Sequence, residues 1–231
     1  MREEADAVRL AKALVEVGEA AGLPIVTLIS DLEQVLGDAV GNALQIFEVI
    51  AFLKGTKQEA RVREVVLAIA AEMVVLAGVS PDMAAARALA EAKLADGSAA
   101  ERFGAMVAAL GGPADLMLNP DRHLDKAEVV APVFSLTSGF VQSMDCWVIG
   151  MALVAMGAGR TNPEDKIDYA VGISQTAHLG DEVSEEVPLC MLHARSQKQW
   201  EQAAAAIREA FAVGAQPITP PPVFRQRFAS Y

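Results

Sequence analysis

The run Pro24-Ile25-Val26-Thr27-Leu28-Ile29-Ser30 is short, almost continuously apolar, and followed by Asp31. A strand with one face in water alternates apolar and polar residues, and this run does not alternate. The pattern is typical of a strand buried on both faces, as in a parallel sheet with helices packed above and below it. Residues 24–30 therefore predict an α/β layer in this part of the chain.

Helical patterns lie on both sides of this strand. Apolar residues at helical spacing predict a helix over residues 3–20. Further helices are expected over 39–53, 59–77, 81–95 and 99–110. Ser80 before Pro81 predicts an N-cap with proline at the first helical position, and Ser98 with Glu101 predicts a capping box. One strand among five helices is not a self-sufficient domain, because its backbone groups and its faces need neighbouring strands.

The hydrophobic period changes near Lys126. Short apolar runs bounded by turn residues predict strands over 128–136, 139–144, 170–176 and 188–194. One helix is expected over 146–157, and Ser196 begins another that runs to about Val213. Residues 217–222 are proline-rich and extended, and they cannot be helical. The expected fold class is α+β or α/β, with a helix-rich part over 1–120, a β-rich part over 126–215 and a proline-rich tail over 216–231.

The composition excludes several classes of protein. The chain has 231 residues, of which 53% are apolar, and 19 basic and 30 acidic residues give it a net charge of −11. Its apolar fraction is too high for an intrinsically disordered chain. An acidic chain with no Lys/Arg-rich run has no electrostatic footprint for nucleic acid or anionic lipid. The longest apolar stretches, 65–79 and 148–159, are shorter than the roughly 20 residues of a membrane-spanning helix, so no membrane partner is expected.

The two cysteines indicate a redox compartment. Cys146 and Cys190 lie far apart in apolar runs, and no secretory signal precedes them. We expect two reduced core thiols in a cytoplasmic protein.

The usual catalytic and metal-binding motifs are not evident in the sequence. His123, His178 and His193 lack the spacing of a zinc site, so each is expected to be a surface or strand histidine. There is no Gly-x-Ser-x-Gly elbow and no Walker A loop. The run Gly157-Ala158-Gly159-Arg160 could cradle a phosphate through its backbone N–H groups. It follows a predicted helix rather than opening one, so helix-stop glycines are the better interpretation.

The most unusual stretch lies between Leu36 and Glu48. Gly37 and Gly41 stand close together before an apolar helix, which implies a tight approach of the backbone to its neighbours. Free carbonyl groups in such a turn can bind a hard cation, and Glu48 could add a carboxylate oxygen. On the pattern alone, a cation site and a plain turn at a helix start both stay open.

Several motifs together resemble those of a known family. Ser30-Asp31-Leu32-Glu33-Gln34-Val35-Leu36-Gly37 followed by Val40-Gly41-Asn42-Ala43-Leu44 resembles the Thr-Asp-Met-Asn-Gln-Pro-Leu-Gly…Val-Gly-Asn-Ala-Leu signature of thymidine phosphorylases and related pyrimidine-nucleoside phosphorylases. Later segments agree with the same family in the same order, over 96–109, 138–145, 156–172, 179–183 and 188–194. The chain thus resembles only the C-terminal half of this family.

The resemblance implies that this chain holds one part of an enzyme. Family members are roughly twice as long, and Met1 aligns with the methionine that closes their Gly-Ser-Gly-Ala-Phe-Met segment. Their phosphate loop and base-binding residues precede that point, so no catalytic, phosphate-binding or base-binding residue is expected here. A full-length member would catalyse reversible phosphorolysis, in which phosphate attacks C1′ of a pyrimidine 2′-deoxynucleoside and the base leaves.

The resemblance also implies a partial potassium site and a domain plan. Family members with this site use the carbonyl of the Leu in Leu-Gly, a carbonyl three residues on, and a Glu nine residues beyond that. The corresponding positions here are Leu36, Ala39 and Glu48, and no other cofactor is expected. Residues 1–120 would be the later part of an α/β domain, and 126–215 a β-rich domain of hammerhead or lipoyl-like type.

Two functions stay open from the sequence. In the first, the chain is the C-terminal portion of a thymidine phosphorylase, a transferase of nucleoside salvage, and is inactive until the missing N-terminal half is supplied. In the second, it is a non-enzymatic interaction or assembly module. Such a module would pair with itself as a homo-oligomer, or with another chain, through an exposed sheet edge and apolar face.

Overall fold

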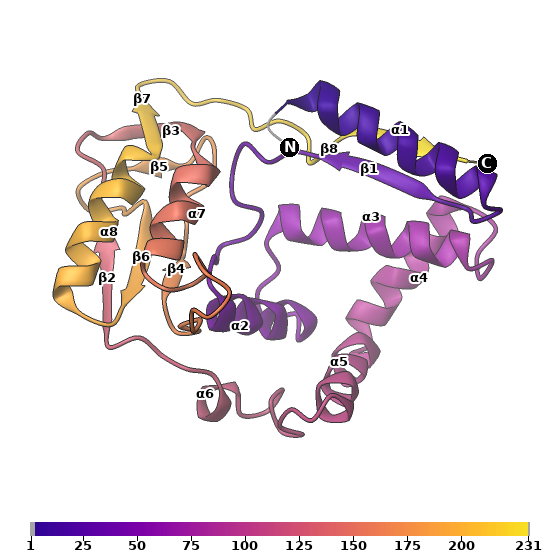
Figure 1. The fold of residues 1–231 in the computed structure, drawn as a ribbon, viewed down its shortest axis with the longest axis horizontal. Helices are drawn as coiled ribbons and strands as arrows, with labels where there is room; N and C mark the ends of the chain where they lie inside the picture. The colour runs from indigo at the N-terminus through magenta and orange to yellow at the C-terminus, as the bar shows by residue number, and fades with distance from the viewer. Residues whose placement is uncertain (1–2, 231) are drawn as a thin grey trace. The chain divides into compact units, whose positions relative to one another are not determined.

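The structure, a computed structural model, describes residues 3–230, so the alignment expected for Met1 lies outside the described residues. Residue contacts divide the chain into two units, which are described separately (Figure 1). Unit 1 comprises Met1–Asp31, Ala60–Ala95 and Pro221–Tyr231, and unit 2 comprises Leu32–Glu59 and Asp96–Pro220. These units interleave along the chain, whereas the predicted domain ranges of 1–120, 126–215 and 216–231 are consecutive. The domain ranges stay a prediction.

Unit 1 combines three helices with a two-stranded sheet. The helices are α1 (Glu4–Ala20), α3 (Ala60–Leu76) and α4 (Met83–Ala95), and the strands are β1 (Val26–Ser30) and β8 (Phe224–Ala229). The two strands are antiparallel, α1 packs against both of them, and α3 packs against α4.

The strand predicted over residues 24–30 is confirmed as β1, but its predicted parallel setting is wrong. Among the described residues β1 pairs with β8 alone, and the pairing is antiparallel. The prolines of the expected tail end at Pro222, so the residues after it keep the N–H groups that a strand needs. Burial is also less complete than predicted, since only Ile29 is buried while Val26 and Leu28 are half-buried.

Two buried acidic residues join the elements of unit 1 through arginines. The Asp31 carboxylate, which has no exposed side-chain surface, accepts hydrogen bonds from Arg61 of α3 at 2.8 Å and from Arg225 of β8 at 3.2 Å. Glu72 of α3 accepts two hydrogen bonds from Arg227 of β8, at 2.6 and 3.0 Å. The loss of such a partner from a buried carboxylate strongly destabilises the fold. These pairs therefore keep β8 attached to the other elements of unit 1.

Unit 2 contains two small antiparallel sheets. Its strands are β2 (Val129–Val133), β3 (Gly139–Met144), β4 (Gly172–Ser174), β5 (Glu182–Val183), β6 (Cys190–Ala194) and β7 (Phe211–Gly214). The strand order is β2-β6-β4 in one sheet and β5-β3-β7 in the other. The helices are α2 (Asn42–Leu53), α5 (Ser98–Ala109), α6 (Pro120–His123), α7 (Cys146–Ala155) and α8 (Gln197–Glu209).

The core of unit 2 lies between these sheets and α7 and α8. α8 packs against β2, β6 and α7. The buried side chains of this core include Val133, Val141, Ile173, Leu192 and Ile207, each with at most 1% of its surface exposed. The mixture of helices and small antiparallel sheets confirms the predicted α+β fold class. None of the helices within residues 3–230 has the length and apolar character that a membrane crossing requires.

The predicted helix starts have mixed outcomes. Ser196 is confirmed as the N-cap of α8, since its Oγ accepts a hydrogen bond from the Gln199 N–H at 3.2 Å. The cap predicted at Ser80 is wrong, because α4 begins later and the Asp82 carboxylate accepts from the Ala85 N–H at 2.8 Å. A short polar side chain two residues further along thus performs the expected role.

Two other local predictions are wrong. The capping box at Ser98 does not form, because Gly97 is the N-cap and the Ser98 hydroxyl donates to Asp96 instead. The helix expected to reach Val213 ends at Glu209, and the residues after Ala210 form β7 against β3. Tertiary pairing with a neighbouring strand has overridden the local helical preference there.

Candidate functional site

The segment between β1 and α2 is anchored on β4 by two reciprocal backbone hydrogen bonds. The Val40 N–H donates to the Ile173 carbonyl at 2.9 Å, and the Ile173 N–H donates to the Val40 carbonyl at 2.8 Å. Gly41 and Gly172 lie against each other at this contact, with φ of 146° and 157°. A Cβ on Gly41 would lie 2.7 Å from the Val171 carbonyl oxygen, so only glycine allows this approach.

Glu48 of α2 reaches back to the turn that precedes the helix. Its Oε1 accepts a hydrogen bond from the Asp38 N–H at 2.6 Å. A Cβ on Gly37 would lie 2.5 Å from the same oxygen, so any other residue at that position would displace the Glu48 carboxylate. Burial raises the pKa of the Glu48 carboxyl, and the hydrogen bond from Asp38 offsets this only in part.

The three predicted cation ligands therefore lie around one turn. Within residues 3–230, the carbonyl oxygens of Leu36 and Ala39 accept no hydrogen bond, and Glu48 supplies a carboxylate beside them. Donors that are all oxygen fit a hard cation such as potassium. No group of three His, Cys, Asp or Glu suited to a metal ion occurs in the described part of the chain. Potassium binding at this turn stays a prediction.

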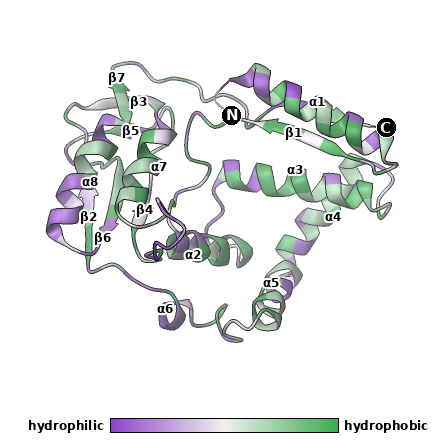
Figure 2. Cartoon of the chain, viewed as in Figure 1, coloured by the Kyte–Doolittle hydropathy of each residue, from purple (hydrophilic) through white to green (hydrophobic). Residues whose placement is uncertain are grey.

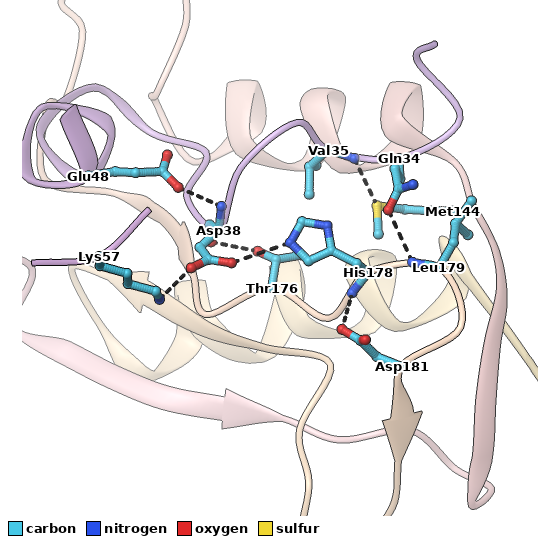
Figure 3. A network of polar contacts seen from close by, with 10 residues as sticks. All are labelled: Gln34, Val35, Asp38, Glu48, Lys57, Met144, Thr176, His178, Leu179 and Asp181. Atoms are coloured by element: carbon cyan, nitrogen blue, oxygen red, sulfur yellow. Dashed lines mark hydrogen bonds and ion pairs between the residues drawn. The ribbon is translucent and has the colours of Figure 1, made fainter. Parts of the chain in front are cut away.

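Asp38 is the centre of a polar network next to this turn (Figure 3). Its carboxylate forms an ion pair with Lys57 and lies 3.3 Å from Nε2 of His178. Its carbonyl oxygen accepts hydrogen bonds from the Thr176 hydroxyl at 3.0 Å and the Thr176 N–H at 3.2 Å. Burial acts to raise the pKa of Asp38, but the hydrogen bonds from Lys57 and His178 outweigh it. The pKa of Asp38 consequently lies below its ordinary value.

The residues before the turn are also held by polar contacts with the later part of unit 2. The buried Gln34 side chain accepts a hydrogen bond from the Leu179 N–H at 3.1 Å, and the Val35 N–H points at the Met144 sulfur at 3.4 Å (Figure 3). Within the described residues, Nε2 of Gln34 and Nδ1 of His178 are buried without a hydrogen-bond partner. The segment is thus attached along its length, from Gln34 to Val40.

An open groove of about 510 Å³ lies beside the network. Its lining includes Asp38, Thr176, His178, Asp181 and Glu182. The His178 N–H donates to the Asp181 carboxylate at 2.8 Å, which fixes the backbone of that wall. The groove is lined by carboxylates, so its surface chemistry favours cationic over anionic groups.

The other sequence predictions for functional residues have separate outcomes. His193 lies on β6 and contacts the Ser174 hydroxyl at 2.8 Å, and His123 contacts Asp115 at 2.6 Å. Gly157 follows α7 with φ of 97°, which confirms that it ends the helix.

Neither cysteine forms a disulfide in the described part of the chain. Cys190 is buried, and burial raises the pKa of its thiol to about 12, whereas Cys146 at the start of α7 is half-buried. The predicted core position is thus confirmed for Cys190, whose thiol stays protonated at neutral pH, whereas Cys146 lies only partly in the core.

The sequence did not reveal the network around Asp38. His178 is 140 residues away from Asp38 in the chain, and it lies in the turn after β4 rather than on a strand or an open surface. Lys57 and Thr176 belong to no motif. Only the folded contacts between the loop and the sheet bring these side chains together.

We expect the Lys57→Met substitution to raise the pKa of Asp38. Burial raises the pKa of Asp38, and the variant loses one of the two side-chain hydrogen bonds that lower it. The ordinary pKa of this carboxyl is 3.8. Because the native pKa of Asp38 is lowered, its stabilising contribution is present above pH 3.8 and is lost as the pH falls through the native pKa. Because the native pKa of Asp38 lies closer to 3.8 in the variant, the stability that protonation of Asp38 removes in acid should be smaller in the variant than in the wild type.

The measurement is an NMR titration of the Asp38 carboxyl carbon, combined with thermal unfolding between pH 2 and pH 6. Lys126→Met is the matched control, because Lys126 pairs with the exposed Asp121 and does not contact the network. An unchanged titration of Asp38 in Lys57→Met would contradict the assigned cause of the shift.

Comparison with known proteins finds similarity to one family. Residues 140–214 match the model of the pyrimidine nucleoside phosphorylase C-terminal domain. The chain is 42% identical over 217 residues to the thymidine phosphorylase of Burkholderia orbicola (strain MC0-3). The aligned region covers 94% of this chain and 50% of that protein. The thymidine phosphorylase of Burkholderia cenocepacia (strain HI2424) gives the same identity and coverage. The chain spans about half the length of these relatives. The chain therefore matches a C-terminal portion of the thymidine and pyrimidine-nucleoside phosphorylase family.

Proposed function

We propose that this chain supplies the C-terminal part of a pyrimidine-nucleoside phosphorylase and does not catalyse phosphorolysis alone. The observation that carries the proposal is the similarity to thymidine phosphorylases. The identity is 42% over 94% of this chain, and the aligned region covers 50% of the relative's length. In the proposed reaction, phosphate attacks C1′ of a pyrimidine 2′-deoxynucleoside, and free base and deoxyribose 1-phosphate are formed. The phosphate- and base-binding groups would come from a complementary polypeptide.

Within that enzyme, the proposed role of this chain is to position a turn and a cation. The reciprocal hydrogen bonds of Val40 with Ile173 and the hydrogen bond of Asp38 with Glu48 hold the turn in one conformation. Leu36, Ala39 and Glu48 would provide oxygen ligands for potassium. The bound cation would offset the charge of the half-buried Glu48 carboxylate.

Potassium is expected to stabilise unit 2 at neutral pH. A ligand that binds only the folded state adds RT ln(1 + [L]/Kd) to the free energy of unfolding, which is about 1–3 kcal/mol at concentrations 10- to 100-fold above Kd. Thermal unfolding in KCl and in choline chloride at equal ionic strength measures this effect. The stabilisation should vanish in Glu48→Gln and persist in Glu101→Gln, an exposed acidic residue of α5. Equal stabilisation of all three proteins by KCl would exclude a site at Glu48.

The test of the proposed function is phosphate-dependent release of thymine from thymidine. The purified chain alone is expected to give no release above background. Addition of the portion of the Burkholderia orbicola thymidine phosphorylase that this chain does not match is expected to restore it. Turnover by the chain alone would show that its own residues bind phosphate, and the Gly157 to Arg160 turn would then be the first segment to examine.

Failure of a correctly assembled mixture to release thymine would favour the second candidate function, a non-enzymatic assembly module. The absence of a disulfide between Cys146 and Cys190 in the described residues supports a cytoplasmic location for either function, because thiols stay reduced in that compartment.

A further inference from the structure

The turn before α2 brings two carboxylates close together. Glu48 accepts a hydrogen bond from the Asp38 N–H at 2.6 Å. Burial raises the pKa of the Glu48 carboxyl, and the negative charge of the Asp38 side chain raises it further. Glu48 is the one charged residue of α2, which is otherwise mostly apolar and is coloured mainly green in Figure 2. Because like charges repel, a cation beside the two carboxylates stabilises this turn.

Lys57 supplies such a cation from the chain itself. Its ammonium group forms an ion pair with one oxygen of the Asp38 carboxylate, while Nε2 of His178 lies 3.3 Å from the other oxygen (Figure 3). Burial has the largest effect on the pKa of Glu48, but the positive charge of Lys57 acts in the opposite direction and lowers it. One ammonium group thus acts on both carboxylates.

The backbone from which Lys57 extends is fixed, whereas its side chain is not. The Thr56 and Lys57 N–H groups donate to the Ala51 carbonyl at 3.0 and 3.4 Å, and the Thr56 hydroxyl donates to the same oxygen at 3.1 Å. The Lys57 side chain is 60% exposed. Ion pairs of such exposed side chains are weak, so a cation from solution can replace the ammonium group.

An ammonium group and a potassium ion have similar chemistry. Both are compact monovalent cations, and both bind oxygen atoms. They differ in that the lysine is tethered to the turn, whereas potassium comes from solution. Two positive charges beside the same carboxylates repel each other, so each weakens the binding of the other.

We propose that Lys57 is a tethered competitor of potassium at the turn formed by Leu36, Ala39 and Glu48. The inference rests on the proposed function for the identity of the ion. Without potassium, the ammonium group offsets the charge of the two carboxylates and holds the turn. Potassium displaces it only at a higher concentration than a chain without this lysine would need.

The test is thermal unfolding of the full chain over a series of KCl concentrations, with choline chloride added to keep the ionic strength constant. In Lys57→Met, the KCl concentration that gives half of the stabilisation should fall by about 10-fold, because the competing charge is removed. Lys57→Arg keeps the positive charge and should resemble the wild type. Lys126→Met is the matched control, because Lys126 pairs with Asp121 outside this network.

Methylammonium chloride tests whether an ammonium group itself occupies the site. This cation has the same head group as lysine, and it should stabilise Lys57→Met more than the wild type or Lys126→Met. Equal stabilisation of the three proteins by methylammonium would overturn the role of Lys57 as a tethered cation.

The outcomes separate this inference from the proposed function. Equal half-saturating KCl concentrations for the wild type and Lys57→Met would overturn the competition, and so would the lack of any KCl effect on both. A lower concentration for Lys57→Met without thymine release from the assembled mixture would support the competition and count against the enzyme. Thymine release together with equal concentrations would support the enzyme and overturn the competition.

Discussion

Replacement of Gly172 by alanine is expected to lower the free energy of unfolding of unit 2 by about 3 kcal/mol. The new Cβ would collide with the Val40 carbonyl oxygen and would lie 2.9 Å from the Gly41 Cα, and both are backbone atoms that no side-chain rotation can move. The φ of 157° at Gly172 adds backbone strain for any other residue. The loop would then separate from β4, and the turn that holds Glu48 would lose its anchor.

Chemical denaturation, followed by the exchange of the Ile173 amide, measures this effect. Gly150→Ala is the matched control, because Gly150 lies within α7 and a Cβ there meets no atom within 4 Å. The control should keep its stability or gain up to about 1 kcal/mol from better helix propensity. Equal stabilities of Gly172→Ala and Gly150→Ala would mean that the close approach of the loop to β4 does not form.

The second large effect is expected for Asp31→Ala in unit 1. The Asp31 side chain is fully buried, and Arg61, its partner at 2.8 Å, has 12% of its side chain exposed. Removal of the carboxylate leaves a buried guanidinium without its counter-charge, which costs about 3–5 kcal/mol for a buried ion pair that loses one partner. Arg225 of β8 loses the same partner, so β8 should separate from β1 more readily.

Asp6→Ala is the control for this prediction, because Asp6 and Arg9 form an ion pair on the exposed side of α1 with side chains 47% and 79% exposed. Exposed pairs contribute less than about 1 kcal/mol, so this variant should resemble the wild type. The measurement is exchange of the β8 amides together with denaturant unfolding. A loss for Asp31→Ala no larger than that for Asp6→Ala would show that the cluster with Arg61 and Arg225 is not buried in solution.

Most elements with a strong periodic pattern could be predicted from the sequence. The strand at 139–144 agrees with β3 at both ends, and the helices expected over 3–20, 59–77 and 146–157 agree with α1, α3 and α7 to within about two residues. β8 was missed, because the tail was interpreted from its prolines. β7 was missed because Ala-rich residues before it continue the helical pattern of α8.

The candidate site was only partly accessible to sequence reasoning. Gly37, Gly41 and Glu48 are close in the chain, so the pattern indicated a tight turn with a carboxylate above it, and the structure contains that turn. The partners His178 and Thr176 lie about 140 residues further along, and no local pattern connects them to Asp38.

The sequence by itself determined most of the strongly periodic elements and the resemblance to the family. Apolar periodicity depends on neighbours a few residues apart, and the glycine and carboxylate motifs have a recognisable order. The tertiary structure alone decided the antiparallel pairing of β1 with β8, the burial of Asp31 between two arginines, and the ion pair and hydrogen bonds around Asp38. These features join residues that are far apart in the chain. These interactions contribute to stability only after folding removes the charges and backbone groups from water. No pattern of neighbouring residues in the sequence predicts them.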